Sequence, residues 1–159
     1  MIELPLASAA DSEQLGARLA LDVPWSAGRP LSLFLSGDLG SGKTTVARGL
    51  LRALGVTEIV RSPSYTLLET YEPGGHRVLH LDLYRLSGGA ELQALGLRDE
   101  LDAGVLLLVD WPERAREALP TPDLELHLSL AGQGRRASLQ AGTPAGASWL
   151  LRVKDKIAL

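Results

Sequence analysis

The residue types best suited to chemistry lie together in one short stretch of the chain. Residues 37–44 read Gly-Asp-Leu-Gly-Ser-Gly-Lys-Thr and match the Walker A pattern of Gly, any four residues, then Gly, Lys and Ser or Thr. Glycines allow successive backbone N–H groups to turn into one concavity that attracts anionic oxygens. In such a loop the lysine neutralises the β- and γ-phosphates of a nucleoside triphosphate, and the hydroxyl ligates Mg²⁺. The pattern positions, which we expect to bind a purine nucleoside triphosphate with Mg²⁺, are Gly37, Gly42, Lys43 and Thr44.

A loop of this kind needs a strand before it and a helix after it. Residues 31–35 form a short, continuous apolar run, which is typical of a buried central strand. Residues 44–54 place apolar side chains on one side of a helix, and Gly55 is a typical helix stop. The N-terminus of that helix favours negative charge, because its N–H groups are unpaired and the positive end of its dipole lies there. The alternative, a glycine-rich turn with an incidental lysine, does not require this order of elements.

Two aspartates are candidates for the carboxylate that holds Mg²⁺, directly or through water, in such sites. Asp110 ends an apolar run, and open α/β sheets place ligands at the carboxyl ends of their strands. Its alternative role is to cap a helix begun by Pro112. Asp82 lies on an expected strand, on one face with His80; its alternative is a solvated face, paired with Arg85. A lone histidine such as His80 is more often packed or exposed than catalytic.

A third motif, Ser-Pro-Ser-Tyr-Thr at residues 62–66, carries three serine and threonine hydroxyl groups within five residues. Pro63 forces an extended or turn conformation on this segment. We expect a switch in which the hydroxyls of Ser62, Ser64 and Thr66 close on the γ-phosphate. An ordinary polar loop is the alternative.

The other elements are expected around this centre. Residues 11–21 predict an amphipathic helix, and residues 67–72 and 77–84 predict a β-hairpin around Pro-Gly-Gly at 73–75. Short helices are expected at 91–95, 97–102 and 113–119, a strand pair at 123–130 and 137–140, and 145–153 is ambiguous between helix and strand. Strands interleaved with helices predict an α/β fold: a P-loop NTPase-like three-layer sandwich with a mixed, mostly parallel sheet and a β-hairpin, in one domain over residues 1–159.

Composition excludes several classes of protein. The 159 residues fit one domain, and the absence of cysteine excludes a disulfide framework and a thiolate metal site. A formal net charge of −3 argues against a protein that mainly grips DNA or another phosphodiester backbone. No export signal or apolar run of about 20 residues is present, so we expect a cytoplasmic protein without a membrane partner. Lysine occurs only at positions 43, 154 and 156, so the Walker A position holds the only lysine before residue 154.

Four motifs in order, residues 37–45, 62–66, 80–86 (His-Leu-Asp-Leu-Tyr-Arg-Leu) and 110–113 (Asp-Trp-Pro-Glu), resemble those of the TsaE family of bacterial ATPases. The resemblance runs from about residue 31 to 130. It implies binding and hydrolysis of ATP in a complex with the partner proteins TsaB and TsaD. That complex attaches a threonylcarbamoyl group to the adenosine beside the anticodon of certain tRNAs. The resemblance implies that TsaD performs the transfer, that hydrolysis resets the complex, and that tRNA is met through the partners.

The resemblance also implies roles for individual residues. Thr44 and Asp110 would ligate Mg²⁺, and Asp82 would lie near the γ-phosphate, so that Lys43, Asp82 and Asp110 carry the hydrolysis. The nucleotide-binding set would comprise Gly37, Gly40, Ser41, Gly42, Lys43, Thr44, Thr45 and Arg135. Two positions depart from the family. Asp110 stands where glutamate is usual, and its shorter side chain favours a water-mediated metal contact; Ser64 stands where threonine is commoner.

The leading hypothesis for function is therefore a weak ATPase whose turnover depends on partners. A small-molecule kinase is the runner-up, but the chain shows no arginine-rich lid insertion of the kind that encloses an acceptor. A nucleotide-responsive binding module with negligible hydrolysis is a third hypothesis, which Asp110 in place of glutamate keeps open.

Overall fold

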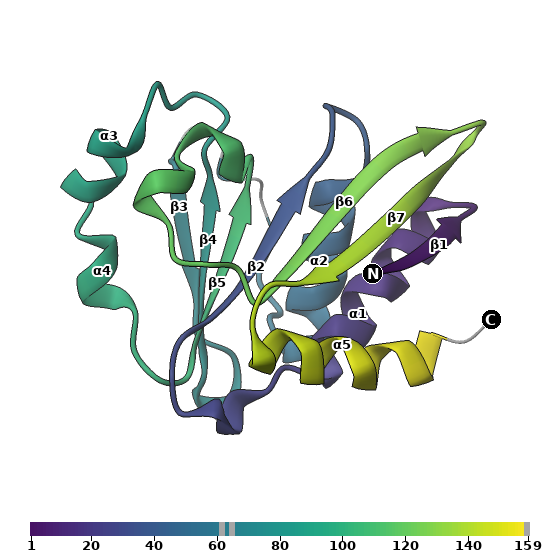
Figure 1. The fold of residues 1–159 in the computed structure, drawn as a ribbon, viewed down its shortest axis with the longest axis horizontal. Helices are drawn as coiled ribbons and strands as arrows, with labels where there is room; N and C mark the ends of the chain where they lie inside the picture. The colour runs from purple at the N-terminus through teal and green to yellow at the C-terminus, as the bar shows by residue number, and fades with distance from the viewer. Residues whose placement is uncertain (61–62, 64–65, 158–159) are drawn as a thin grey trace.

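The computed structural model of the protein describes residues 1–60, 63 and 66–157, whose strands form one twisted sheet with helices on both faces (Figure 1). The strands are β1 (Ile2–Leu6), β2 (Leu31–Ser36), β3 (Leu68–Tyr71), β4 (Arg77–Asp82), β5 (Val105–Asp110), β6 (Leu124–Ala131) and β7 (Gly134–Ala141). The α-helices are α1 (Ala9–Leu21), α2 (Lys43–Leu54), α3 (Gly89–Ala94), α4 (Leu97–Glu100) and α5 (Pro144–Ile157). Short 3₁₀ turns are η1 (Trp25–Ala27), η2 (Pro73–Gly75), η3 (Pro112–Arg114) and η4 (Arg116–Ala118).

The sheet has the order β1-β7-β6-β2-β5-β4-β3. Neighbours β6, β2, β5 and β4 run parallel, whereas β3 pairs antiparallel with β4, and β7 pairs antiparallel with both β6 and β1. Strand β2 therefore lies between β5 and β6, both of which follow it in sequence. The sheet is extended first on the β5–β4 side of β2 and then on its β6 side. Ligands of open α/β sheets bind at the carboxyl ends of strands at such a reversal. The predicted α/β sandwich with a mixed, mostly parallel sheet and a hairpin is confirmed.

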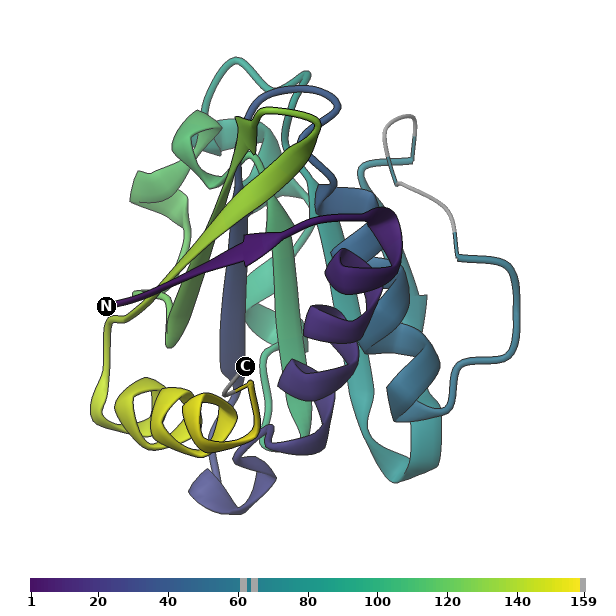
Figure 2. The same cartoon turned by 90° about the vertical axis from the view of Figure 1, so that its right-hand side faces the viewer.

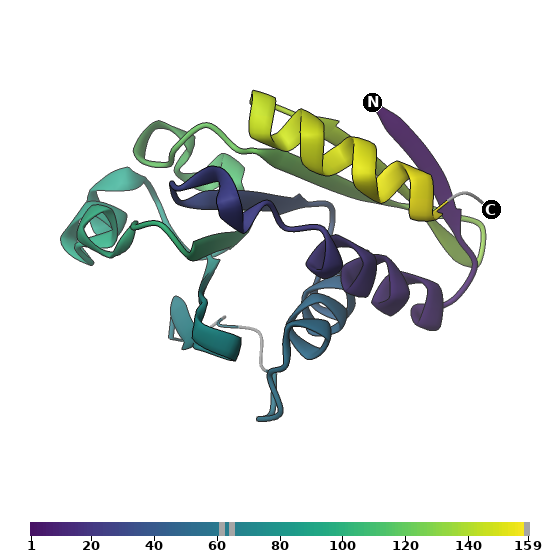
Figure 3. The same cartoon turned by 90° about the horizontal axis from the view of Figure 1, so that it is seen from below.

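Strand alternation divides the core into two layers. In β2, Leu31, Leu33 and Leu35 pack with α1, α2 and α5, whereas Phe34 packs on the opposite face. Figure 3 shows α1 and α2 on one side of the sheet and α3 and α4 on the other. Helix α5 joins the first layer through Trp149, which is fully buried and donates its indole N–H to the Leu19 carbonyl at 3.0 Å.

In the described part of the chain, no helix is both long and apolar enough to cross a membrane.

Three segments differ from the sequence expectations. Strand β1 was not expected, although its buried Leu4 and Leu6 alternate with Glu3 and Pro5; it is an edge strand, where proline is tolerated. The helix predicted at 113–119 is wrong: this segment holds parts of two 3₁₀ turns, separated by Ala115 at φ −152°, which is not helical. The ambiguous segment 145–153 is helical and belongs to α5.

Helices α1 and α2 lie unusually close together, because glycines replace side chains where they meet. A Cβ atom on Gly16 would lie 2.0 Å from the Val46 carbonyl oxygen, and one on Gly49 would lie 2.0 Å from the Glu13 carbonyl oxygen. Figure 2 shows the two helices side by side, both starting at the same end of the molecule. The glycine contacts thus determine where α2, and the loop before it, lie relative to the start of α1.

This contact predicts that Gly49→Ala destabilises the protein. The methyl group meets backbone, which cannot rotate away, so we expect a loss of about 2 kcal/mol after allowing for the better helix propensity of alanine. The melting temperature should fall by about 4 to 8 °C. The control is Gly88→Ala, whose backbone is extended (φ 172°) and whose added methyl would have no neighbour within 4 Å. Equal melting temperatures for the two variants would contradict the packing argument.

Candidate nucleotide-binding site

The segment between β2 and α2 forms a tight loop that only glycines can follow at three positions. Gly37, Gly40 and Gly42 have φ angles of +141°, +80° and +104°, in the left-handed region that other residues rarely adopt. Gly37 also lies against the neighbouring strand β6, since an added Cβ would be 2.4 Å from the Leu128 carbonyl oxygen. The loop ends at the first turn of α2, so its backbone curls around the N-terminus of that helix.

Lys43, the first residue of α2, turns its side chain back into the loop. Its ammonium donates hydrogen bonds to the carbonyls of Gly37 and Asp38, the latter at 3.1 Å. The same ammonium lies 4.4 Å from the centroid of the Trp111 ring, which is a cation–π contact. Burial lowers the pKa of Lys43 below its usual value, although Asp110 and other nearby carboxylates oppose that shift. The loop therefore holds a desolvated cation where an anionic ligand would arrive.

The two candidate aspartates end adjacent parallel strands. Asp82 on β4 is the register partner of Asp110 on β5, and their side chains lie in one cleft. Asp82 is 8% exposed and accepts a hydrogen bond from the Tyr84 backbone N–H at 3.0 Å, so it does not lie on a solvated sheet face. Asp110 is 2% exposed and does not cap η3, where Trp111 occupies the N-cap position without a side-chain hydrogen bond. The helix-cap alternative for Asp110 is therefore wrong.

Two residues beside these carboxylates have strained backbones. Leu67 and Trp111 have φ angles of +70° and +59°, which cost of order 1–3 kcal/mol each in residues other than glycine. Trp111 follows Asp110 directly, and Leu67 accepts a hydrogen bond from the Asp82 N–H at 3.1 Å. The conformation of Trp111 brings its ring over Lys43 and within 4.8 Å of the Tyr84 ring centroid. Strain of this kind accumulates at functional sites.

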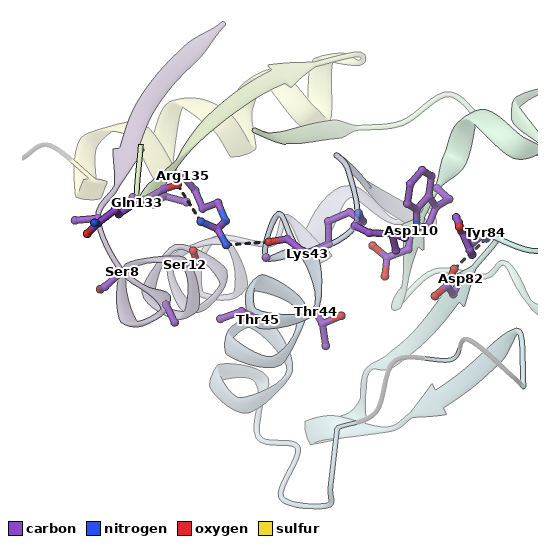
Figure 4. Close-up of a pocket in the computed structure, with 18 residues that line it drawn as sticks. Ser8, Ser12, Lys43, Thr44, Thr45, Asp82, Tyr84, Asp110, Gln133 and Arg135 are labelled. Atoms are coloured by element: carbon purple, nitrogen blue, oxygen red, sulfur yellow. Dashed lines mark hydrogen bonds between the residues drawn. The ribbon is translucent and has the colours of Figure 1, made fainter. Parts of the chain in front are cut away.

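A cleft of about 590 Å³ joins these groups, which is within the usual size range of small-ligand sites. One side consists of the glycine loop, the start of α2, and the ends of β4 and β5; the other consists of the start of α1 and the β6–β7 turn (Figure 4). Arg135 connects the two sides, because its guanidinium donates to the Gly40 carbonyl at 2.9 Å. Ser8, Ser12 and Gln133 line the second side and are not among the site residues predicted from the sequence. No motif signals them, since residues 8 and 12 are far from residue 133 in sequence and come together only because β1 pairs with β7.

Most predicted site residues converge on this cleft. Its lining includes Gly40, Gly42, Lys43, Thr44, Thr45, Asp82, Asp110 and Arg135. Gly37 and the buried Ser41 do not line it, and instead shape the loop from behind. Thr66 does not line it either; its hydroxyl donates to the Glu69 carboxylate at 3.0 Å. Ser62 and Ser64 lie outside the described residues, so the switch remains a prediction.

The donor groups in the cleft suit a magnesium ion that is only partly held by protein. Within the described ranges, no group of three histidine, cysteine, aspartate or glutamate side chains is arranged to hold a metal. Mg²⁺ in nucleotide sites is usually bound by one or two protein oxygens, with phosphates and waters completing the octahedron. Asp110 Oδ1 is buried and has no hydrogen-bond partner among the residues that the structure describes, as expected of an oxygen reserved for a cation. Thr44 and Asp110 therefore fit such an ion.

Comparison with known proteins places this geometry in a family. The model of the family described as threonylcarbamoyl adenosine biosynthesis protein TsaE matches residues 6–138. A relative named tRNA threonylcarbamoyladenosine biosynthesis protein TsaE, from Haemophilus influenzae Rd, is 37% identical over 118 residues, covering 74% of this chain and 75% of the relative. A protein of the same name from Bacillus subtilis 168 is 38% identical over 104 residues, covering 65% of each chain.

The fold is also shared with a solved structure. The crystal structure of Bacillus subtilis YdiB superimposes with a TM-score of 0.79 over 98% of this chain and 95% of that one, at 24% sequence identity. The family match covers the strand, glycine loop, helix and both aspartates, so the resemblance inferred from four short motifs is confirmed. This chain belongs to the TsaE family of threonylcarbamoyl adenosine biosynthesis proteins.

Proposed function

We propose that this protein is a Mg²⁺-dependent ATPase of the cytoplasm that acts with TsaB and TsaD in forming threonylcarbamoyladenosine beside the anticodon of tRNA. One observation carries the nucleotide part: the Lys43 ammonium and the Asp82 and Asp110 carboxylates line one cleft at the mouth of the glycine loop. The pathway is supported by the names of the relatives. With a net charge of −3, the protein would meet tRNA through its partners.

The triphosphate would bind where the loop meets α2. Backbone N–H groups of residues 40–45 and the helix dipole favour anionic oxygens there. Lys43 would exchange the carbonyls of Gly37 and Asp38 for the β- and γ-phosphates without a large movement, since its side chain already points into the loop. Because the ammonium is already desolvated, its attraction to phosphate is stronger than that of an exposed lysine.

The two carboxylates would have different roles. Thr44 and Asp110 would hold Mg²⁺, which neutralises phosphate charge when bound. Asp82 would accept a hydrogen bond from the attacking water and orient it toward the γ-phosphate. Its own orientation is maintained by the Tyr84 N–H at the end of β4. Phosphoryl transfer demands mainly positioning and electrostatic stabilisation, which this arrangement supplies.

The second side of the cleft would hold the nucleoside. Ser8 and Ser12 at the start of α1, with Gln133 at the β6–β7 turn, offer hydroxyl and amide groups to a base or ribose. Arg135 would close the nucleotide between the two sides, because it already bonds to the Gly40 carbonyl in the loop. Adenine recognition would thus come from elements far from the Walker A motif in sequence.

Lys43→Ala should abolish detectable ATP binding, because the phosphates lose the only buried ammonium in their site. We expect the dissociation constant measured by calorimetry to rise by about 100-fold or more, from a loss of about 3 kcal/mol. Lys154→Ala is the control, since Lys154 is exposed on α5 away from the cleft. Micromolar binding by a folded Lys43→Ala protein would overturn the assignment of the loop.

ATP binding should weaken as the pH rises through the lowered pKa of Lys43 in the free protein. Bound phosphates favour the charged ammonium and raise its pKa, so binding above the pKa of the free protein must take up a proton. Calorimetry at alkaline pH in two buffers with different ionisation enthalpies measures this uptake directly. Lys43→Arg should show none, because arginine stays protonated. Proton release at this step by the wild-type protein would contradict the argument.

Phosphate release from Mg-ATP by the protein alone should be slow and should rise when TsaB and TsaD are added together. Asp82→Asn should lower the stimulated rate by about 100-fold, because a positioned general base is lost. Its ATP affinity should stay within about threefold of wild type, since the amide keeps the contact to the Tyr84 N–H. Asp155→Asn, at an exposed position on α5, is the control. Binding without stimulation would refute the partner role, and an unchanged rate in Asp82→Asn would refute the role of Asp82.

A further inference from the structure

His80 is a buried polar side chain in this region that the proposed mechanism does not use. It lies on β4, two residues before Asp82, and is only 1% exposed. Its Nε2 atom is 3.4 Å from Oδ2 of Asp110, and its Nδ1 atom has no hydrogen-bond partner in the described structure. His80 does not line the nucleotide cleft. His80 therefore contacts Asp110, which lines the cleft, but is not itself part of the cleft lining.

Asp110 depends on this contact more than an exposed carboxylate would. Its Oδ2 lies beside His80, and no described group forms a hydrogen bond to its buried Oδ1. The torsion that orients a carboxylate group is broad and permits rotation. A hydrogen bond to one oxygen therefore decides where the other oxygen points. Without that bond, a buried carboxylate would turn toward whichever donor it could reach, Lys43 among them.

We propose that His80 is a positioning residue: its Nε2–H donates to Asp110 Oδ2 and so holds Oδ1 ready for the nucleotide-bound divalent cation. This inference rests on the proposed function, because it assigns His80 a role toward the cation that Asp110 would hold. The need for such a residue is greatest when the carboxylate is short. An aspartate reaches less far from β5 than a glutamate, so a small rotation moves its free oxygen away from the cleft.

The experiment measures cation affinity and does not depend on turnover. Mn²⁺ replaces Mg²⁺ and is titrated by electron paramagnetic resonance into the protein with a non-hydrolysable ATP analogue. His80→Leu should weaken Mn²⁺ binding by about 10- to 100-fold, as is typical when the outer partner of a metal ligand is lost. His80→Gln, whose amide N–H reaches a position near Nε2, should restore most of that affinity. Binding of the analogue in EDTA should stay within about threefold of wild type in both variants.

A double-mutant cycle separates positioning from a general structural effect. If His80 acts through Asp110, His80→Leu should change Mn²⁺ affinity less than twofold in an Asp110→Asn background. His76→Leu, at the β3–β4 turn where the ring stacks on Trp25, controls for loss of a histidine elsewhere. If His80→Leu does not fold, His80→Phe, with a ring of similar size, takes its place throughout.

The outcomes distinguish this inference from the proposed function. If wild-type protein binds the analogue without any contribution from Mn²⁺, the proposed cation role fails first. If wild type and His80→Leu bind Mn²⁺ with equal affinity in the presence of the analogue, the positioning role of His80 alone is overturned. The positioning role would also be overturned if His80→Leu weakened binding of the analogue equally in EDTA and in Mn²⁺ and His80→Gln did not restore it. His80 would then be only a structural residue.

Discussion

The arrangement of the site depends on one buried cation, the ammonium of Lys43. A buried charge is costly unless polar partners surround it, and the loop supplies them through the carbonyls of Gly37 and Asp38. The carbonyls point inward only because the loop follows left-handed backbone angles at its glycines. The carboxylates of Asp82 and Asp110 compensate further, and they oppose the lowering of the lysine pKa. The charge of Lys43, the conformation of the glycine loop and the aspartates that end β4 and β5 therefore depend on one another.

The parallel register of the sheet brings those strand ends together. Strands β4, β5 and β2 are aligned so that Asp82 pairs with Asp110, and Asp110 pairs with Leu35 just before the loop. Buried parallel strands are continuous apolar runs, and a polar residue at their carboxyl end marks the point where the core stops. Packing that stabilises the fold, through residues such as Leu107 and Val109, thereby also holds the charged groups in place.

Stability and function conflict at a few positions near the cleft. Trp111 and Leu67 keep left-handed backbones that favour glycine, and Asp110 retains a buried oxygen without a hydrogen-bond partner in the described structure. Each of these costs free energy in the free protein. A bound nucleotide and its cation would satisfy the oxygen and occupy the space beside the ring of Trp111. The close contact at Gly16 and Gly49 offsets part of this cost by packing α1 firmly on α2.

Local chemistry is what the sequence alone determined. A phosphate loop needs glycines, one lysine and one hydroxyl at set spacing, so residues 37–44 predicted phosphate binding, a strand before the loop and a helix after it. The structure has that strand and that helix. The apolar runs of β2 and β5 and the Pro-Gly-Gly turn were equally local signals. By contrast, β1 and the 3₁₀ turns after β5 were not predicted correctly, because edge pairing and single backbone angles such as that of Ala115 depend on distant contacts.

Tertiary structure alone decided which polar residues meet. Asp82 and Asp110 each had a plausible local role. Burial excluded a solvated sheet face for Asp82, and the N-cap position of Trp111 excluded a helix cap by Asp110. The contact of His80 with Asp110 links residues 30 positions apart. Arg135 reaches Gly40 across 95 positions, from the opposite side of the cleft. Such contacts follow from strand order and register, which no local pattern encodes. The sequence therefore predicted the phosphate-binding loop, and the fold decided which side chains surround it, because proximity between distant residues arises only when the sheet assembles.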